Sequence, residues 1–457
     1  MIISIDPATG EEIARFATLT CEEVDGALSA ATTAQANWQQ VSLTNRVALL
    51  VSLAKVLRAG KARFAAMIVR EMGKPVVEAE GEIEKCAWNC DFYAENASIF
   101  LADEIIESSA TESSVVFDPL GVVLAVMPWN YPFWQLFRFA APALAAGNGI
   151  VLKHASNVCE CALAIEGIFR EAGSPEGLFR TLLIDAKDVA KVISDPRIAA
   201  VTFTGSTEVG SSIASVAGKA IKKQVLELGG SDPFIVLADA DIAMAATAAV
   251  SARYINVGQS CVNAKRFIVD KSIADEFVDA FCSRVRELKI GDPIDRDTQI
   301  GPLARSNLRD TLHRQVEHSV VKGAHLRQGG EFIERPGFYY APTVLDHVTA
   351  GMPAFDEETF GPVAAIIRAG DTTSAIELAN RSEFGLGAAL WTRDLSEARR
   401  LARQLQAGAV FINGIVASDP RLPFGGIKKS GYGRELGIYG IREFTNIKTV
   451  WIGPSRT

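Results

Sequence analysis

The sequence lacks an apolar run long enough to cross a membrane. Its longest candidate, residues 139–152, is interrupted by Pro142, Gly147, Asn148 and Gly149, whereas a span needs about 18 uninterrupted apolar residues. It also lacks an excess of basic residues, since 46 Lys and Arg stand against 54 Asp and Glu, for a formal charge of −8. An acidic chain repels phosphate backbones and anionic lipids, so the composition argues against nucleic-acid and membrane partners.

The sequence also lacks a regular pattern of metal-binding or disulfide-forming residues. Its seven cysteines are an odd number without framework spacing, and its first residues have neither the basic nor the apolar segment of a signal peptide. We therefore expect reduced thiols in the cytoplasm. Cys86 and Cys90 share one face of an expected helix, which would suit a metal pair, but no histidine precedes His154. A packed helix face is the favoured interpretation, and we expect no metal site.

What the sequence does contain is a change from helical to alternating structure. The 457 residues suggest two or three domains. Between residues 21 and 100, apolar side chains recur at helical spacing. From about residue 114, short β-rich runs alternate with helical ones, which is typical of βαβ units around a parallel sheet. A second alternation begins near Gly229 and Gly230, so the sequence predicts two α/β domains that meet there.

Two segments offer a site for a dinucleotide. In AAVTFTGSTEVGSSIA (199–214), a strand leads through Gly205 and Ser206 into a helix, whose N-terminus presents free N–H groups to a pyrophosphate. The usual G-x-G-x-x-G fingerprint is absent, so a plain strand-to-helix turn remains an alternative. In IVLKHASN (150–157), Lys153 ends a strand, at the edge where ligands lie in doubly wound folds. A solvated lysine in a loop is the alternative there.

Three further residues carry groups suited to catalysis. Asn130 follows a strand in MPWNYP and offers an amide to a developing oxyanion. Glu227 has apolar neighbours in LELGGSDP, so its pKa should be raised as a general base requires, unless the carboxylate faces solvent. Cys261, in NVGQSCVNAKRF, lies among small and polar residues, which favours a nucleophile over an inert buried thiol.

The segments MPWN, FTGST, LELGG, GQSC, EETFGPV and LPFGGIKKSGYGRE resemble, in order and spacing, the NAD(P)-dependent aldehyde dehydrogenase superfamily. The resemblance covers nearly the whole chain. It implies Cys261 as the nucleophile, Glu227 as the general base, and Asn130 with the Cys261 backbone N–H as the oxyanion hole. The cofactor-binding residues that it implies are Met127, Pro128, Trp129, Lys153, Ser156, Gly205, Ser206, Glu227, Leu228, Gly229, Glu358 and Phe360.

The same resemblance implies an α/β fold with three parts. A Rossmann-like parallel-sheet domain that binds NAD(P) would comprise residues 1–98 and 119–229, and an α/β catalytic domain would comprise residues 230–430. Residues 99–118 and 431–457 would form a small β arm for oligomerisation. We expect a homodimer or homotetramer, since an exposed edge strand tends to be paired.

Around Lys153 the chain departs from the common pattern of the superfamily. That pattern has proline after the lysine and often glutamate three residues after it, where this chain has His154 and Ser156. A glutamate there would repel a 2′-phosphate, whereas serine can donate a hydrogen bond and Lys153 supplies positive charge. We predict that NADP is the preferred cofactor and that NAD is used less well.

The expected substrate depends on Arg138, which follows Asn130 by eight residues. An arginine at this offset resembles that of succinate-semialdehyde dehydrogenases, where it pairs with the distal carboxylate of the aldehyde; most helix arginines, however, are surface or packing residues. The segment GIVASDPRLPFGG (414–426) resembles a bacterial branch of that group and adds Ser418 and Arg421 as candidate substrate ligands. The expected reaction is the oxidation of succinate semialdehyde to succinate, as in 4-aminobutyrate breakdown.

The same residues leave alternative substrates and functions open. Glutarate semialdehyde, lactaldehyde and other aliphatic aldehydes remain alternative substrates. A cysteine hydrolase or acyltransferase would also use Cys261, but it normally needs a histidine partner, and none of the five histidines lies in a pairing motif. A catalytically inactive binding protein would have lost Cys261 or Glu227, and both are present.

Overall fold

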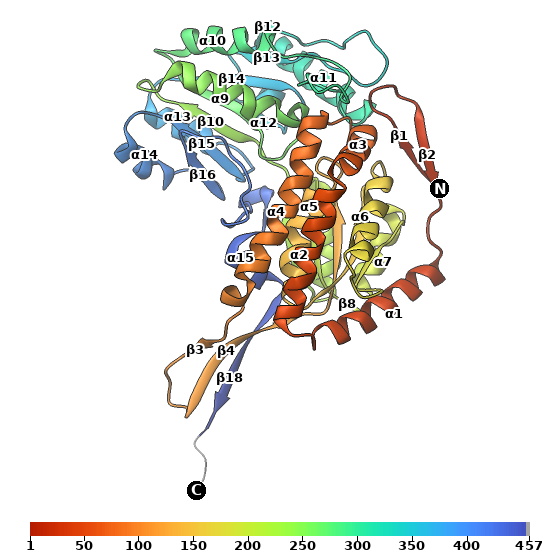
Figure 1. Cartoon of the computed structure of the whole chain (residues 1–457). Coiled ribbons are helices and arrows are strands. Elements are labelled where there is room, and N and C mark those ends of the chain that lie inside the picture. The colour runs from red at the N-terminus through yellow and green to blue at the C-terminus, as the bar shows by residue number, and fades with distance from the viewer. Residues whose placement is uncertain (454–457) are drawn as a thin grey trace.

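The computed structural model describes residues 1–453, and its first hundred residues are mainly helical, as the spacing predicted (Figure 1). A short antiparallel hairpin that the sequence did not predict comes first. Thr20 and Glu23 then form a capping box at the start of the first helix, which fixes where that helix begins. These elements are β1 (Ile2–Ile5), β2 (Glu12–Phe16), α1 (Cys21–Trp38), α2 (Leu43–Ala59), α3 (Lys61–Met72) and α4 (Val76–Phe100).

A six-stranded sheet follows, in the order β17-β9-β8-β5-β6-β7. Its strands are β5 (Val122–Met127), β6 (Gly149–His154), β7 (Phe179–Thr181), β8 (Ile198–Thr204), β9 (Lys223–Glu227) and β17 (Gly431–Tyr432). Only β17 is antiparallel to its neighbour. The connecting helices are α5 (Trp134–Ala145), α6 (Cys159–Glu171), η1 (Ala186–Asp188), α7 (Val189–Ser194) and α8 (Thr207–Lys219). Because the parallel strands share one direction, the polar segments after β5, β6, β8 and β9 meet at one edge.

The second sheet has seven strands in the order β12-β13-β14-β11-β10-β15-β16. They are β10 (Asp232–Val236), β11 (Ala264–Asp270), β12 (His325–Gln328), β13 (Thr343–Asp346), β14 (Val363–Ala369), β15 (Gly387–Trp391) and β16 (Ala409–Ile412). Its helices are α9 (Ile242–Tyr254), η2 (Ile255–Gly258), α10 (Ala274–Arg286), α11 (Ser306–Val321), α12 (Pro353–Asp356), α13 (Thr372–Asn380) and α14 (Leu395–Ala402). All neighbours pair in parallel except β12 with β13.

The chain passes between the two sheets twice. Gly229 and Gly230 lie between β9 of the first sheet and β10 of the second. The glycine-rich segment 425–436 contains η3 (Lys428–Ser430) and returns to the first sheet as β17. The first sheet is therefore completed by residues that follow the whole second sheet in sequence.

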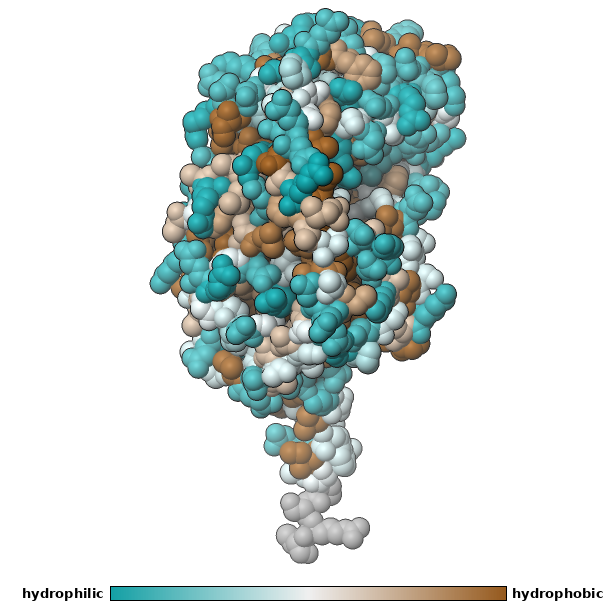
Figure 2. All heavy atoms as spheres, turned by 90° about the vertical axis from the view of Figure 1, so that its right-hand side faces the viewer, coloured by the Kyte–Doolittle hydropathy of each residue, from teal (hydrophilic) through white to brown (hydrophobic). Residues whose placement is uncertain are grey.

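A long β arm protrudes from the body (Figures 1 and 2). It consists of β3 (Glu104–Ile105), β4 (Glu112–Pro119) and β18 (Thr445–Ile452), and α15 (Gly437–Glu443) precedes its last strand. β18 pairs antiparallel with β4 along its full length, from Thr445 opposite Pro119 to Ile452 opposite Glu112. Asp118 and Pro119 both belong to β4, and the break before β5 falls at Leu120 and Gly121.

Burial in the body explains how polar groups become isolated from water. Every residue of α5 is buried, because this helix lies between α4 and the first sheet. Cys86 and Cys90 are both buried on α4, as expected for a packed helix face. Within residues 1–453, no group of three or more His, Cys, Asp and Glu is arranged to hold a metal ion. No helix in the same range has the length and apolar character of a membrane span.

Candidate active site

Cys261 lies just after an unusual turn that joins α9 to β11. Asn256 and Val257 in η2 have φ values of 55° and 56°, which L-residues, and a β-branched valine above all, rarely adopt. The turn is held by a hydrogen bond of 2.7 Å from the Asn256 backbone N–H to the Glu78 carboxylate. The Asn256 side chain also donates to the Asn130 carbonyl at 3.0 Å. Such a backbone persists only where its surroundings fix it, and functional sites are where this is commonly found.

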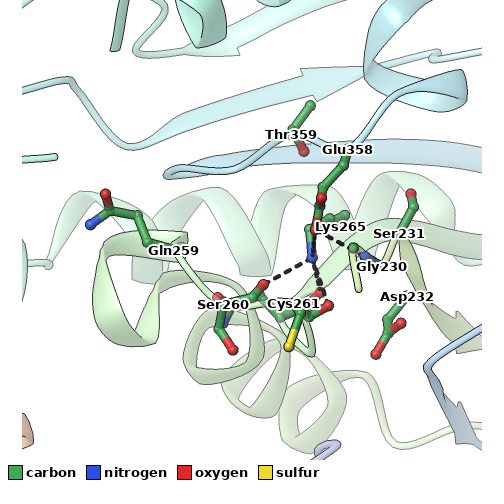
Figure 3. A network of polar contacts seen from close by, with 12 residues as sticks. Gly230, Ser231, Asp232, Gln259, Ser260, Cys261, Lys265, Glu358 and Thr359 are labelled. Carbon is green, nitrogen blue, oxygen red and sulfur yellow. Dashed lines mark hydrogen bonds and ion pairs between the residues drawn. The ribbon is translucent and has the colours of Figure 1, made fainter. Parts of the chain in front are cut away.

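A buried lysine fixes the backbone on the other side of Cys261. The Lys265 ammonium, fully buried on β11, donates to the carbonyls of Ser260 at 3.0 Å and Cys261 at 2.9 Å. It also forms an ion pair of 3.6 Å with Glu358, whose carboxylate accepts a hydrogen bond from the Gly230 N–H at 3.0 Å. Figure 3 shows Lys265 between Glu358 and the two carbonyls, with the Cys261 sulfur directed away from it. Lys265 thus connects the segment that carries the thiol to the EETFGP segment.

Close backbone packing at this point requires the two glycines between β9 and β10. A Cβ atom on Gly230 would lie 2.5 Å from the Cys261 carbonyl oxygen, and one on Gly229 would lie 2.5 Å from the Glu358 carboxylate. Any side chain at either position would push the two segments apart. This close packing gives a physical reason for the LELGG motif.

A cavity of about 280 Å³ opens beside Cys261. Its wall is formed by α4, by the start of α5, by the turn around Cys261 and by the segment after β16. The wall includes the side chains of Lys85, Trp134, Arg138, Cys261 and Ser418. The structure therefore brings the predicted nucleophile and two of the three predicted substrate ligands to one cavity.

Glu227 ends β9 and is buried with neither carboxylate oxygen hydrogen-bonded within the described residues. Burial raises its pKa to about 8; Arg138 opposes this rise, whereas the neighbouring Glu435 adds to it. Arg138 itself forms a buried ion pair with Glu435, and its guanidinium lies 4.6 Å from the centre of the Phe424 ring. Arg138 is therefore a buried cation with two carboxylates close to it.

Burial also controls the thiol. It raises the pKa of Cys261 to about 12, and the positive charges of Arg138 and Lys265 are the largest opposing effects. Asn130, 4% exposed, donates its side-chain N–H to the Gln259 carbonyl at 3.0 Å, two residues before the thiol. The amide group is thus held against the segment that carries Cys261, as an oxyanion donor must be.

The predicted cofactor residues lie along the edge where the parallel strands end. Ser206 caps α8 by accepting a hydrogen bond from the Val209 N–H at 3.4 Å. Lys153 is partly buried at the end of β6, and within residues 1–453 no carboxylate forms an ion pair with it. Ser156 is exposed. His154 is buried, and burial lowers its pKa to about 4, so the imidazole is neutral at pH 7. Its Nε2–H donates a hydrogen bond to the Pro132 carbonyl at 2.8 Å, which anchors this loop.

The remaining predicted cofactor residues come from three strand ends or loops. Met127 ends β5, with Pro128 and Trp129 directly after it, and Leu228 follows β9. The Trp129 and Phe360 rings meet edge to face with their centres 5.7 Å apart. The MPWN and EETFGP segments, which are more than 200 residues apart, therefore contact each other at this edge.

One predicted residue is not brought to the cavity, and several functional neighbours were not predicted. Arg421 is exposed and pairs with Asp419 at 2.6 Å, outside the cavity lining. Sequence reasoning assigned no role to Lys85, Lys265 or Glu435, although GYGREL, which contains Glu435, was among the motifs. The signal in the sequence for Glu435 is its position within the LPFGGIKKSGYGRE motif.

Comparison with known proteins agrees with this geometry. Residues 1–450 match the model of the aldehyde dehydrogenase family. The chain is 49% identical over 454 residues to succinate-semialdehyde dehydrogenase [NADP(+)] 1 of Mycobacterium tuberculosis (strain H37Rv), with 99% of each chain covered. It is also 49% identical to succinate semialdehyde dehydrogenase [NAD(P)+] Sad of Escherichia coli (strain K12), with 98% of this chain and 97% of the other covered.

A solved structure also matches over nearly the whole chain. Succinic semialdehyde dehydrogenase from Streptococcus pyogenes, in complex with NADP+, superposes with a TM-score of 0.97 at 37% identity, covering 99% of this chain and 100% of the other. The chain belongs to the aldehyde dehydrogenase family, and the predicted fold class is confirmed.

Proposed function

We propose that this protein oxidises succinate semialdehyde to succinate, with NADP as its preferred cofactor. The observation that carries the proposal is that one cavity brings the thiol of Cys261 together with Arg138 and Ser418. A short aldehyde with a distal carboxylate has the two functional groups that this wall can engage. The relatives named succinate-semialdehyde dehydrogenase, at 49% identity over nearly the full chain, support the same substrate.

In the proposed reaction, the Cys261 sulfur bonds to the aldehyde carbon and gives a thiohemiacetal. Asn130 and the Cys261 backbone N–H donate to the oxygen on which negative charge develops. Loss of hydride from the same carbon leaves a thioester. Glu227, ionised, then removes a proton from water, and the hydroxide adds to the thioester carbon; the C–S bond breaks, the Cys261 thiolate leaves, and succinate is released.

The residues at the strand edge suit a dinucleotide with an additional phosphate. Lys153 and Ser156 offer a cation and a hydroxyl, no carboxylate within residues 1–453 forms an ion pair with Lys153, and Ser206 begins a 13-residue helix with free N–H groups. Glu358 and Phe360 would hold the nicotinamide half. When bound, the nicotinamide supplies the hydride acceptor. We accordingly assign residues 1–98 and 119–229 to the cofactor domain and residues 230–430 to the catalytic domain.

The substrate proposal is tested by initial rates of NADPH formation with a panel of aldehydes. Succinate semialdehyde should have a kcat/KM at least about tenfold above that of butanal, which lacks the carboxylate. Glutarate semialdehyde and lactaldehyde complete the panel. A higher kcat/KM for any of these three aldehydes would overturn the assignment.

The cofactor proposal is tested by comparing kcat/KM for NADP and NAD. NADP should give the larger value, and Ser156→Glu should shift the preference toward NAD, because the new carboxylate repels a 2′-phosphate. Fluorescence titration with NADPH and NADH gives the same comparison without turnover. A preference for NAD above tenfold in the unaltered protein would contradict the proposal.

A further inference from the structure

The cavity contains a cation that neither the sequence motifs nor the proposed reaction has used. Lys85 on α4 donates a hydrogen bond of 2.8 Å from its ammonium to the Ser418 hydroxyl. The same ammonium lies 4.5 Å from the centre of the Trp134 ring, and all three residues line the cavity beside Cys261. We infer that Lys85 binds the distal carboxylate of the substrate, together with Ser418 and Arg138. This inference rests on the proposed function.

The charges around the cavity indicate why Lys85 is needed. Arg138 already has a carboxylate partner, because it forms a buried ion pair with Glu435. Glu82, which also lines the cavity, pairs with Lys74 and accepts hydrogen bonds from the Phe133 and Trp134 N–H groups at 2.8 and 3.0 Å. Within residues 1–453, no carboxylate forms an ion pair with Lys85. Lys85 is therefore the cation of this wall whose charge is not balanced by a direct partner.

The surroundings of Lys85 favour a carboxylate ligand over bulk water. Burial and, next, the nearby charge of Arg138 lower the pKa of Lys85 to about 8, and the groups that oppose this effect are Cys86, Asp419 and Glu82. Asp419 is held by Arg421, and Glu82 by Lys74. A carboxylate between Lys85 and Arg138 would relieve the repulsion between the two cations and keep Lys85 protonated. The Trp134 ring adds a favourable cation–π interaction with the Lys85 ammonium.

Two substrates that differ only at the distal end separate this role from a structural one. Lys85→Met removes the charge at nearly constant volume. The ratio of kcat/KM for succinate semialdehyde to that for butanal should fall about tenfold to a hundredfold, which is the loss expected for a charge-assisted hydrogen bond. Most of this loss should appear in KM for succinate semialdehyde. Lys85→Arg should restore at least half of the lost selectivity, on a logarithmic scale.

Two further measurements guard against misfolding and against an incorrect substrate. Succinate should inhibit butanal oxidation competitively in the unaltered protein and at least about tenfold more weakly in Lys85→Met. Lys55→Met, on the exposed face of α2, is the matched control and should leave every value unchanged. NADPH titration and thermal unfolding show whether each variant is folded.

The outcomes are distinguishable. If Lys85→Met leaves the selectivity ratio and the succinate inhibition unchanged, or lowers both substrates equally, the inference about Lys85 is overturned. If the unaltered protein does not prefer succinate semialdehyde to butanal, the proposed function is overturned. Weaker succinate inhibition in Lys85→Met would still support a carboxylate site at Lys85 in that case.

Discussion

At the scale of single residues, the site is a set of ionisable groups whose burial shifts them away from their ordinary charge states. The thiol of Cys261 and the carboxyl of Glu227 both have raised pKa values, and both lie within the influence of the Arg138 guanidinium. Each is therefore held in the protonated state at neutral pH. The charged forms that catalysis requires must be favoured by neighbouring cations and by bound ligands.

The first prediction concerns the reactivity of Cys261 in the absence of cofactor. Because its pKa is raised to about 12, alkylation by iodoacetamide should be slow at pH 7 and rise about tenfold per pH unit, without a plateau up to about pH 10. Mass spectrometry of the Cys261 peptide measures this rate. Lys265→Met should slow the reaction further, whereas Lys271→Met, an exposed lysine beyond the other end of β11, should not. A plateau below pH 8 would contradict the prediction.

The second prediction concerns Glu227, whose folded-state pKa is raised from 4.5 to about 8. Between these two values the unfolded chain ionises Glu227 while the folded chain keeps it protonated. The stability that Glu227 contributes is thus fully present below about pH 4.5 and is lost as pH rises toward 8. Glu227→Gln, which cannot ionise, should gain Tm relative to the unaltered protein by roughly 2 °C or more across this range. Calorimetry from pH 5 to 8.5 measures the difference.

The same variant should lose turnover by about a hundredfold to ten-thousandfold, because it lacks the base that activates water. Rapid mixing should still show one burst of NADPH, since Glu227 is not needed before the thioester forms. An equal loss of the burst and of the steady state would contradict this role.

The sequence predicts reactive roles for three residues of the site but assigns none to the residues around them. Cys261, Glu227 and Asn130 lie in short motifs whose local composition points to chemistry. Lys85, by contrast, lies on a helix that has both polar and apolar positions. In such a helix the pattern predicts that a lysine is exposed to solvent. Its hydrogen bond to Ser418 joins residues 333 positions apart, and these meet only because the segment after β16 lies against α4.

At the scale of elements, the short strand β17 positions Glu227, the general base of the proposed reaction. Gly431 pairs with Glu227 and Tyr432 with Leu226, while the Leu228 N–H donates to the Ser430 carbonyl at 3.0 Å. A two-residue strand within a glycine-rich segment has no detectable periodicity, so the sequence did not predict β17. The β1–β2 hairpin was missed for a similar reason, since its strands have only four and five residues.

The third prediction tests this arrangement with Gly431→Ala. Gly431 has a φ of 111°, and a Cβ atom added there would clash with the Leu226 carbonyl oxygen. The new methyl group must therefore displace β17. We expect a loss of stability of about 1–3 kcal/mol and a larger loss in kcat than in the NADPH burst. Gly218→Ala on α8 is the control, because no atom lies near its Cβ and a helical alanine is favoured. Unchanged stability and turnover in Gly431→Ala would contradict the role of β17.

At the scale of the whole molecule, the β arm exposes several apolar side chains to solvent. Ile105, Ile447 and Trp451 are more than half exposed, and all but the first residue of β18 are exposed. β18 pairs with β4 on one edge only. An exposed apolar edge strand is a site for pairing with another chain, and we propose that the arm joins copies of this protein into a dimer or tetramer. The last four residues of the segment predicted for this role, 454–457, lie outside the described part of the chain.

The fourth prediction follows from that exposure. The double variant Ile447→Glu and Trp451→Glu places two charges on one face of β18 and should shift the protein to smaller species in sedimentation velocity. Val321→Glu, at an even more exposed apolar residue on α11, should not change the sedimentation coefficient. A single monomeric species in the unaltered protein at micromolar concentration would contradict the proposed assembly.

The late return of β17 has a consequence for biosynthesis. The sheet that begins with β5 receives its last strand only when residue 432 has been made, after the entire second sheet has been synthesised. A nascent chain that has already produced the thiol at residue 261 still lacks the segment that holds Glu227 in place. In the proposed reaction, acyl release therefore becomes possible only when synthesis of the polypeptide is nearly complete.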